Sequence, residues 1–124
     1  MFSRVLIMGL GLLGGSLSRA IKKRSPAGHV IACARNPEKL RGAVDQRIVD
    51  EIQPLSGVRL RGVDLVVITA PVRASISLLA TVLDDPGLGE QALVIDVGSV
   101  KNPIVEAAGA HPRGDRFVGC HPLA

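Results

Sequence analysis

The 124-residue sequence has no tryptophan and no tyrosine, and it has only two phenylalanines. Proteins that bind single-stranded nucleic acids stack the bases on aromatic side chains, and this chain offers almost none. Its net charge of +4 would permit a polyanionic partner, but lysine and arginine are spread out and the densest cluster is only Lys22–Arg24. A basic site for a small anionic ligand explains the charge equally well, so charge alone does not decide. We expect no nucleic-acid partner.

Cysteine and long apolar runs are also scarce. Cys33 and Cys120 are too few and too far apart in sequence for a disulfide framework or a zinc site, so we expect buried free thiols and no metal. No apolar run reaches the roughly 18–20 residues of a membrane-spanning helix. The start of the chain resembles a signal peptide, but the apolar run Val5–Met8 is short and no small-residue cleavage site follows it. We expect a cytoplasmic protein with no membrane partner.

Short β-branched runs alternate with helical patterns along the chain, which is typical of β-α-β units and a parallel sheet. We expect strands at Val5–Met8, Val30–Ala34, Asp64–Thr69, Leu93–Val97 and Phe117–Cys120. We expect helices at about 12–24, 37–44, 72–83 and 101–108, the second of them with Asn36 as its N-cap and Pro37 as its first residue. The stretch 47–62 is the hardest to interpret and could hold a short third strand or only a loop.

A glycine-rich turn follows the first strand directly and opens the first helix. It reads Gly9-Leu10-Gly11-Leu12-Leu13-Gly14. The pattern G-x-G-x-x-G is weak by itself, but between a strand and a helix it indicates a dinucleotide site. Gly9 would allow the tight turn, Gly11 would let backbone N–H groups approach the pyrophosphate, and Gly14 would let helix and strand pack closely. The phosphates would then lie on the N-terminus of the helix, whose dipole favours negative charge.

The alternatives to a dinucleotide site are a glycine turn that holds no ligand and a P-loop. A P-loop is excluded because no Gly-Lys-Ser or Gly-Lys-Thr follows at the required spacing. The turn and the order of the elements together predict an α/β protein of the Rossmann type, with a doubly wound, mainly parallel sheet in a three-layer αβα arrangement. We assign the backbone at Leu12 and Leu13 to the phosphate-binding turn as well.

The residues at the end of the second strand bear on the choice between NAD and NADP. NAD-binding domains usually have a carboxylate there for the ribose 2′-hydroxyl, but this chain has Ala34, followed by Arg35 and Asn36. A guanidinium can bind a 2′-phosphate and no carboxylate repels it, so we expect NADP, with NAD possible. The alternative is that Arg35 is a solvated residue that stacks on the adenine of either cofactor. Ala70-Pro71-Val72, after the strand 64–69, should also face the cofactor.

Two later motifs are more specific than the glycine turn. They are Asp96-Val97-Gly98-Ser99-Val100-Lys101 and Gly119-Cys120-His121-Pro122. With the turn and Ala70-Pro71-Val72, they closely resemble the prephenate dehydrogenase family, which includes arogenate and cyclohexadienyl dehydrogenases. The resemblance covers nearly the whole chain and keeps the order of the motifs. It implies oxidative decarboxylation of prephenate to 4-hydroxyphenylpyruvate, or of arogenate to tyrosine, with hydride transfer to NAD(P) in tyrosine biosynthesis.

The resemblance also implies roles for two catalytic residues. His121 would bond the ring hydroxyl of the substrate, and Ser99 would support the same region. Neutral imidazole is a suitable base at physiological pH. The alternatives are that His121 is structural and that Ser99 only caps the following helix. A Cys120–His121 nucleophilic pair is disfavoured because successive side chains of a strand point to opposite faces. We assign Lys101 no role, and we expect His29 and His111 to be surface residues in turns.

Members of the family pair such a domain with a mostly helical dimerisation domain. We therefore expect residues 1–124 to be an incomplete NAD(P)-binding domain without its substrate domain, and the full-length protein to be a homodimer through the part that is missing. The fragment alone should bind cofactor weakly and show little or no turnover. Two rivals remain: a reductase of the β-hydroxyacid dehydrogenase type and a cofactor-binding module without catalysis. The sequence does not distinguish prephenate from arogenate.

Overall fold

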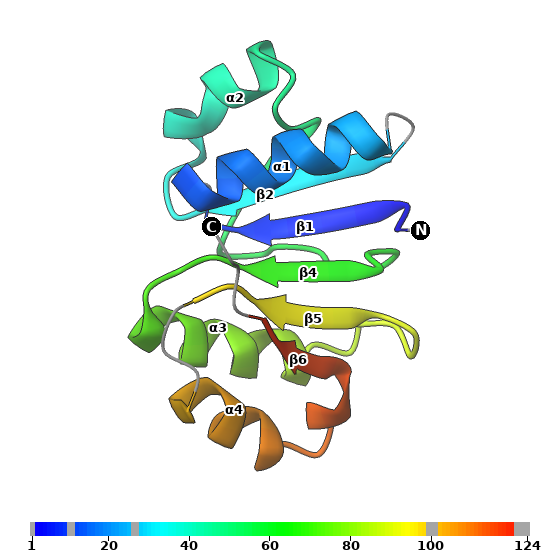
Figure 1. Ribbon diagram of the computed structural model, residues 1–124, viewed down its shortest axis with the longest axis vertical. Helices are drawn as coiled ribbons and strands as arrows, with labels where there is room; N and C mark the ends of the chain where they lie inside the picture. Colours follow the sequence, from blue (N-terminus) through cyan, green and yellow to red (C-terminus); the bar gives the residue numbers. More distant parts are fainter. Residues whose placement is uncertain (1, 10–11, 26–27, 99–101, 121–124) are drawn as a thin grey trace.

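In the computed structural model, which describes residues 2–9, 12–25, 28–98 and 102–120, six strands form one sheet (Figure 1). The strands are β1 (Arg4–Met8), β2 (His29–Ala34), β3 (Glu51–Pro54), β4 (Leu65–Ile68), β5 (Leu93–Asp96) and β6 (Phe117–Gly119). They run in parallel in the order β3-β2-β1-β4-β5-β6. This is the strand order of the doubly wound dinucleotide-binding fold, so the predicted fold class is confirmed.

Helices cover both faces of the sheet. They are α1 (Leu12–Arg24), η1 (Pro37–Leu40), α2 (Arg41–Asp45), α3 (Val72–Asp84), α4 (Asn102–Gly109) and η2 (Gly114–Arg116). Val5 and Ile7 of β1 belong to the apolar cluster under α1 and α2, whereas Leu6 and Met8 belong to the cluster under α3 and α4. All four side chains are buried, which explains why the run 5–8 has no polar alternation. Of the helices in the described residues, none is long and apolar enough to cross a membrane.

The five expected strands are confirmed to within a residue or two at their ends, and the stretch 47–62 does hold a strand, β3. The prediction that Asn36 caps the second helix is wrong, because its side chain makes no capping hydrogen bond. A 3₁₀ turn begins the element instead, closed by the Lys39 N–H donating to the Asn36 carbonyl at 3.2 Å. The α-helical part is therefore short and begins only at Arg41.

Two further expectations are corrected by the topology. His29 is the first residue of β2 and not part of a turn, and its Nε2 lies 2.9 Å from the Glu51 carboxylate on β3. Cys33 is a buried free thiol as expected, but Cys120 is only partly buried. The difference follows from the sheet order, since β2 lies between β1 and β3 whereas Cys120 follows the edge strand β6.

Candidate cofactor site

The turn after β1 is held by hydrogen bonds from the strands on both sides of it. Gly9 has a φ of +94°, a backbone conformation that residues with a side chain rarely adopt. Its N–H donates to the Cys33 carbonyl of β2 at 3.1 Å. On the other side, the hydroxyl of Thr69, which follows β4, donates to the Gly9 carbonyl. The place at which the chain leaves the sheet is thus tied to β2 and β4 together.

Gly14 lets α1 approach this turn closely. A Cβ at this position would lie 2.5 Å from the Gly9 carbonyl oxygen and 3.1 Å from the Thr69 hydroxyl. Real Cβ atoms essentially never come so near a backbone oxygen, so only glycine fits without a shift of the backbone. A Cβ at Gly15, the next residue of α1, would meet nothing within 4 Å. The structure therefore confirms that Gly14 is needed for close packing of helix and strand.

A cleft of about 820 Å³ opens at the carboxyl edge of the sheet beside this turn. Its volume lies within the usual range of small-molecule and cofactor sites, roughly 300–1,000 Å³. The walls are lined by Met8, Gly9, Cys33, Ala34, Arg35, Leu55, Ser56, Val58, Ala70, Pro71, Ala74, Ser77, Leu78 and Thr81. They come from the ends of β1 and β2, from the connection after β3, and from α3 with the two residues before it.

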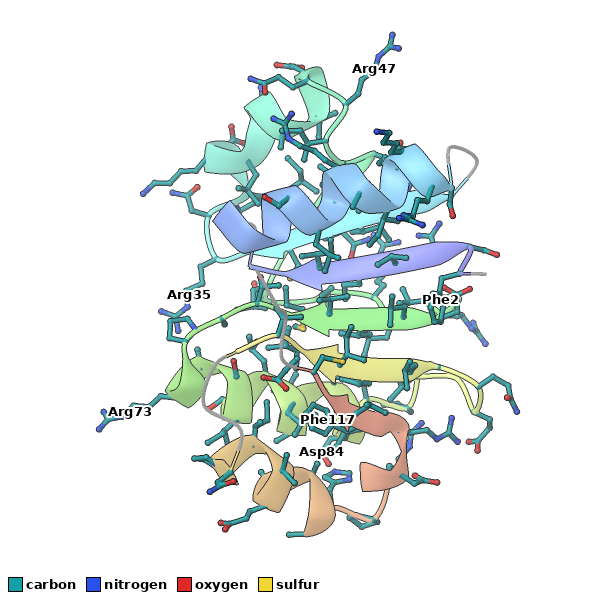
Figure 2. The ribbon with its side chains drawn as sticks, in the orientation of Figure 1. Phe2, Arg35, Arg47, Arg73, Asp84 and Phe117 are labelled. Atoms are coloured by element: carbon teal, nitrogen blue, oxygen red, sulfur yellow. The ribbon has the colours of Figure 1, made fainter. Side chains whose placement is uncertain are left out.

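The structure places four of the nine predicted cofactor residues that it describes in the wall of this cleft. Gly9, Arg35, Ala70 and Pro71 line it, and Gly14 lies directly behind Gly9. In Figure 2, Arg35 lies at the end of the molecule toward which the strand arrows point, whereas Phe2 lies at the opposite end. The backbones of Leu12 and Val72 begin α1 and α3, and Leu13 follows in the first turn of α1. Asn36 is exposed and is not among the lining residues; Gly11, Ser99, Lys101 and His121 lie outside the described residues.

Sequence reasoning missed two walls of the cleft. Ala74 and Leu78 lie three and seven residues after Pro71 on α3, a helical spacing that could have identified them once Pro71 was placed at the site. Leu55 and Val58 come from the stretch that gave no readable pattern. They reach the site because the chain after β3 turns back, with the Leu55 N–H donating to the Ala34 carbonyl at 2.9 Å. No local signal pointed to them.

The charge of the cleft suits a ligand with an apolar ring and an anionic group. Among the lining residues that the structure describes, Arg35 alone carries a charge. The thiol of Cys33 stays neutral at physiological pH, because burial raises its pKa from 9.0 to about 11. The apolar side chains of Leu55, Val58 and Leu78 could pack against a flat ring. The exposed guanidinium of Arg35 is available at the mouth.

The segments that follow β5 and β6 meet at the same edge of the sheet. The Cys120 N–H donates to the Asp96 carbonyl at 3.0 Å, which extends the pairing of the two strands. Asp96 is a buried residue, 2% exposed, and one of its carboxylate oxygens accepts the Gly98 N–H at 3.1 Å. The two motifs that contain Ser99 and His121 therefore start side by side, although these two residues lie outside the described part of the chain.

Comparison with known families agrees with this geometry. The family model for the nucleotide-binding domain of prephenate dehydrogenase matches residues 17–124. The chain belongs to this family. The match begins after the glycine turn, so the case for the turn depends on its own geometry and on relatives that align over nearly the whole chain.

Three such relatives are informative. The prephenate dehydrogenase of Bacillus subtilis is 34% identical over 123 residues, which are 97% of this chain and 32% of that protein. The crystal structure of prephenate dehydrogenase from A. aeolicus in complex with hydroxyphenyl propionate and NAD+ has a TM-score of 0.87 and 33% identity, covering 99% of this chain and 42% of that one. Synechocystis arogenate dehydrogenase has a TM-score of 0.71 and 28% identity, covering 96% and 40%. The chain thus spans 32–42% of the length of these relatives.

Proposed function

We propose that this chain binds a nicotinamide dinucleotide and is the cofactor-binding part of a prephenate dehydrogenase. The observation that carries the proposal is the contact between Gly9 and Gly14 beside a cleft at the carboxyl edge of the sheet. The glycines at positions 9, 11 and 14 would leave room for two linked phosphates, and the helix N-terminus would favour their charge. The adenosine half would occupy the cleft between α3 and the connection after β3. When bound, the cofactor would supply the acceptor for a hydride.

The catalytic roles of His121 and Ser99 are part of the proposal. The substrate would lose a hydride to the nicotinamide cofactor from the ring carbon that bears its hydroxyl, and the hydroxyl proton would pass to His121. Carbon dioxide would then leave, its bonding electrons would make the ring aromatic, and the ring oxygen would take a proton back to form the phenol. Ser99 would support the same part of the substrate. The Cys120–Asp96 hydrogen bond supports this arrangement, because it starts the two segments from neighbouring positions at the carboxyl edge. The A. aeolicus relative was crystallised with hydroxyphenyl propionate and NAD+, which supports a ring-bearing substrate together with a nicotinamide cofactor.

We also propose that the site prefers NADP over NAD. β2 ends at Ala34, and the exposed Arg35 follows at the mouth of the cleft, where a guanidinium could pair with a 2′-phosphate. We expect Arg35→Ala to weaken binding of NADPH about tenfold or more and to leave binding of NADH nearly unchanged. Fluorescence titration with both nucleotides measures this. Equal losses for both would remove the 2′-phosphate role and leave Arg35 as a residue that stacks on adenine.

The decisive experiment for the function is a spectrophotometric assay of the full-length protein with prephenate and arogenate, each with NAD and NADP. We expect turnover of at least one substrate and a large loss of kcat in His121→Asn. A His121→Asn variant with an undiminished kcat would contradict the role of His121 as a base. Binding of NADPH without turnover of either substrate would favour the alternative of a cofactor-binding module.

The isolated 124-residue chain allows a simpler control, because it has no tryptophan or tyrosine and NADPH fluorescence can be followed without a protein background. We expect weak cofactor binding and little or no turnover from it. We also propose that the full-length protein is a cytoplasmic homodimer that assembles through the part beyond this chain. Analytical ultracentrifugation of the full-length protein beside the 124-residue chain tests the assembly, and a monomeric full-length protein would contradict it.

A further inference from the structure

We infer that the Thr69 hydroxyl positions the phosphate-binding turn by holding the Gly9 carbonyl, and that cofactor affinity depends on this hydrogen bond. Thr69 would touch neither the phosphates nor the substrate in this role, since it acts through the backbone of the turn. The inference depends on the cofactor site proposed above and assigns it a further residue.

The pairing of β1 with β4 explains why Thr69 reaches this carbonyl. The two strands are parallel, with Met8 opposite Ile68, so Thr69 and Gly9 are the first residues beyond the ends of neighbouring strands. The Thr69 N–H continues the ladder by donating to the Met8 carbonyl at 3.0 Å. Its hydroxyl lies 3.1 Å from the same carbonyl and also donates a hydrogen bond to the carbonyl of Gly9. The side chain thereby extends the attachment to β4 by one residue into the turn.

This attachment matters because glycine has little conformational preference of its own. Gly9 already adopts a positive φ, and many other orientations of its carbonyl are open to a residue without a Cβ. The hydrogen bond from the Thr69 hydroxyl selects one of these orientations of the Gly9 carbonyl. The Thr69 oxygen would also be 3.1 Å from a Cβ on Gly14, so the turn, α1 and β4 all meet at this one group. A turn that is ordered before the ligand arrives loses less conformational entropy on binding, which raises affinity.

The inference can be tested with two substitutions that differ in one group. Thr69→Val keeps the shape of the side chain but replaces the hydroxyl with a methyl group that cannot donate to the Gly9 carbonyl. Thr69→Ser keeps the hydroxyl and removes only the methyl group. In the full-length protein we expect Thr69→Val to weaken binding of NADPH and NADH by about threefold to tenfold, the factor that corresponds to one net hydrogen bond. Thr69→Ser should bind nearly as well as the unmodified protein.

A matched control is available at the other end of the same two strands. The Asp64 carboxylate accepts the backbone N–H groups of Ser3 at 2.7 Å and Arg4 at 3.0 Å, so it also joins β1 to β4, but far from the turn. We expect Asp64→Ala to lower the temperature of unfolding without changing cofactor affinity. If loss of affinity merely followed loss of stability, Asp64→Ala and Thr69→Val would weaken binding alike, and the inference would be overturned.

Each remaining outcome of this experiment also supports or overturns the inference. Equal affinities for Thr69→Val and the unmodified protein would overturn the inference while leaving the cofactor site intact. A Thr69→Ser variant as weak as Thr69→Val would show that the hydroxyl is not the cause and would overturn it as well. If Thr69→Val does not fold, the pair Thr69→Ser and Thr69→Ala makes the same comparison, with weaker binding expected for Thr69→Ala alone. If the unmodified protein binds neither nucleotide, the proposed function fails, and this inference fails with it.

Discussion

A Cβ built on Gly14 would lie 2.5 Å from the carbonyl oxygen of Gly9, so the first turn of α1 is in direct contact with the end of β1. The two glycines are five residues apart in sequence and belong to a helix and to a strand end. Their contact brings the N-terminus of α1 to the carboxyl edge of the sheet, beside the cleft. Whatever binds in the cleft can therefore reach the positive end of the helix dipole.

This contact predicts opposite effects for two neighbouring glycines of α1. Gly14→Ala should destabilise the fold by about 1–3 kcal/mol, since the added methyl group must push backbone away, and should weaken cofactor binding at least tenfold. Gly15→Ala should be neutral or should stabilise the protein by up to about 1 kcal/mol, because its Cβ meets nothing within 4 Å and alanine favours a helix. Urea unfolding and NADPH titration measure both effects. Similar losses in the two variants would contradict the account of the turn.

The cleft itself can be tested by filling it. Ala74 lines the cleft on α3, whereas Ala80 is an exposed residue of the same helix outside the lining. Ala74→Phe should place a ring in the cleft and reduce cofactor affinity at least tenfold without unfolding the protein, because the space is open. Ala80→Phe should leave affinity unchanged. Isothermal titration with NADPH makes the comparison, and full affinity in Ala74→Phe would exclude this cleft as the adenosine site.

The two cysteines should differ strongly in reactivity. Burial raises the pKa of the Cys33 thiol to about 11, so roughly one molecule in a thousand would carry the thiolate at pH 8. Cys120 is only partly buried. We expect a disulfide reagent at pH 8 to modify Cys120 first and to reach Cys33 only on unfolding. Mass spectrometry of the labelled chain identifies the site, with Cys120→Ser as the control. Rapid labelling of Cys33 in that folded variant would contradict the prediction.

The carboxylate of Glu51 should make stability depend on pH in the acid range. Hydrogen bonds from the Gln53 amide and from His29 lower the pKa of Glu51 below its ordinary value. A carboxylate with a lowered pKa in the folded state stabilises the protein fully above its unfolded pKa, about 4.3, and loses that contribution as the pH falls through the folded pKa. We therefore expect the stability advantage of the unmodified protein over Glu51→Gln to shrink below about pH 4–5.

Gln53→Met provides the control for this titration, because it removes the donor at 2.7 Å and keeps a side chain of similar length. The titration midpoint of the Glu51 carboxylate, followed by NMR, should move upward in that variant toward the ordinary value of about 4.3. An unmoved midpoint would show that the Gln53 amide is not the cause. The nearby Asp50 also has a lowered pKa: partial burial raises it, but hydrogen bonds from Lys22 and from the Val30 N–H outweigh this.

Much of the fold could be predicted because its signals are local. The apolar run 5–8 and the helical spacing of Leu17 and Ile21 indicate residues that pack against the sheet, and the elements lie where these patterns predicted them. The second helix was less predictable, since Asn36 followed by Pro37 suits both a capped α-helix and the 3₁₀ turn that forms. β3 was uncertain for a related reason: it is a short edge strand, and none of its residues is buried.

The residues of the candidate site also form two groups: those that a local pattern predicts and those that only the tertiary structure brings to the site. The glycine turn, Arg35 and Ala70-Pro71 follow the ends of strands, and in a parallel sheet all such ends meet at one edge, so the sequence predicted their place. Leu55 and Val58 reach the cleft only because the connection after β3 returns to β2, and Thr69 acts only because β4 pairs with β1 in one particular register. For residues such as Leu55, Val58 and Thr69, no pattern in the neighbouring sequence indicates their role.

The sequence alone predicts the parallel doubly wound sheet, the dinucleotide turn and the resemblance to prephenate dehydrogenases. Each of these depends on motifs whose residues are near one another in the chain. Only the tertiary structure decides which atoms hold the turn and what lines the cleft. The physical reason is distance: the Gly9 carbonyl and the Thr69 hydroxyl are 60 residues apart in sequence, and only the pairing of β1 with β4 brings them within a hydrogen bond.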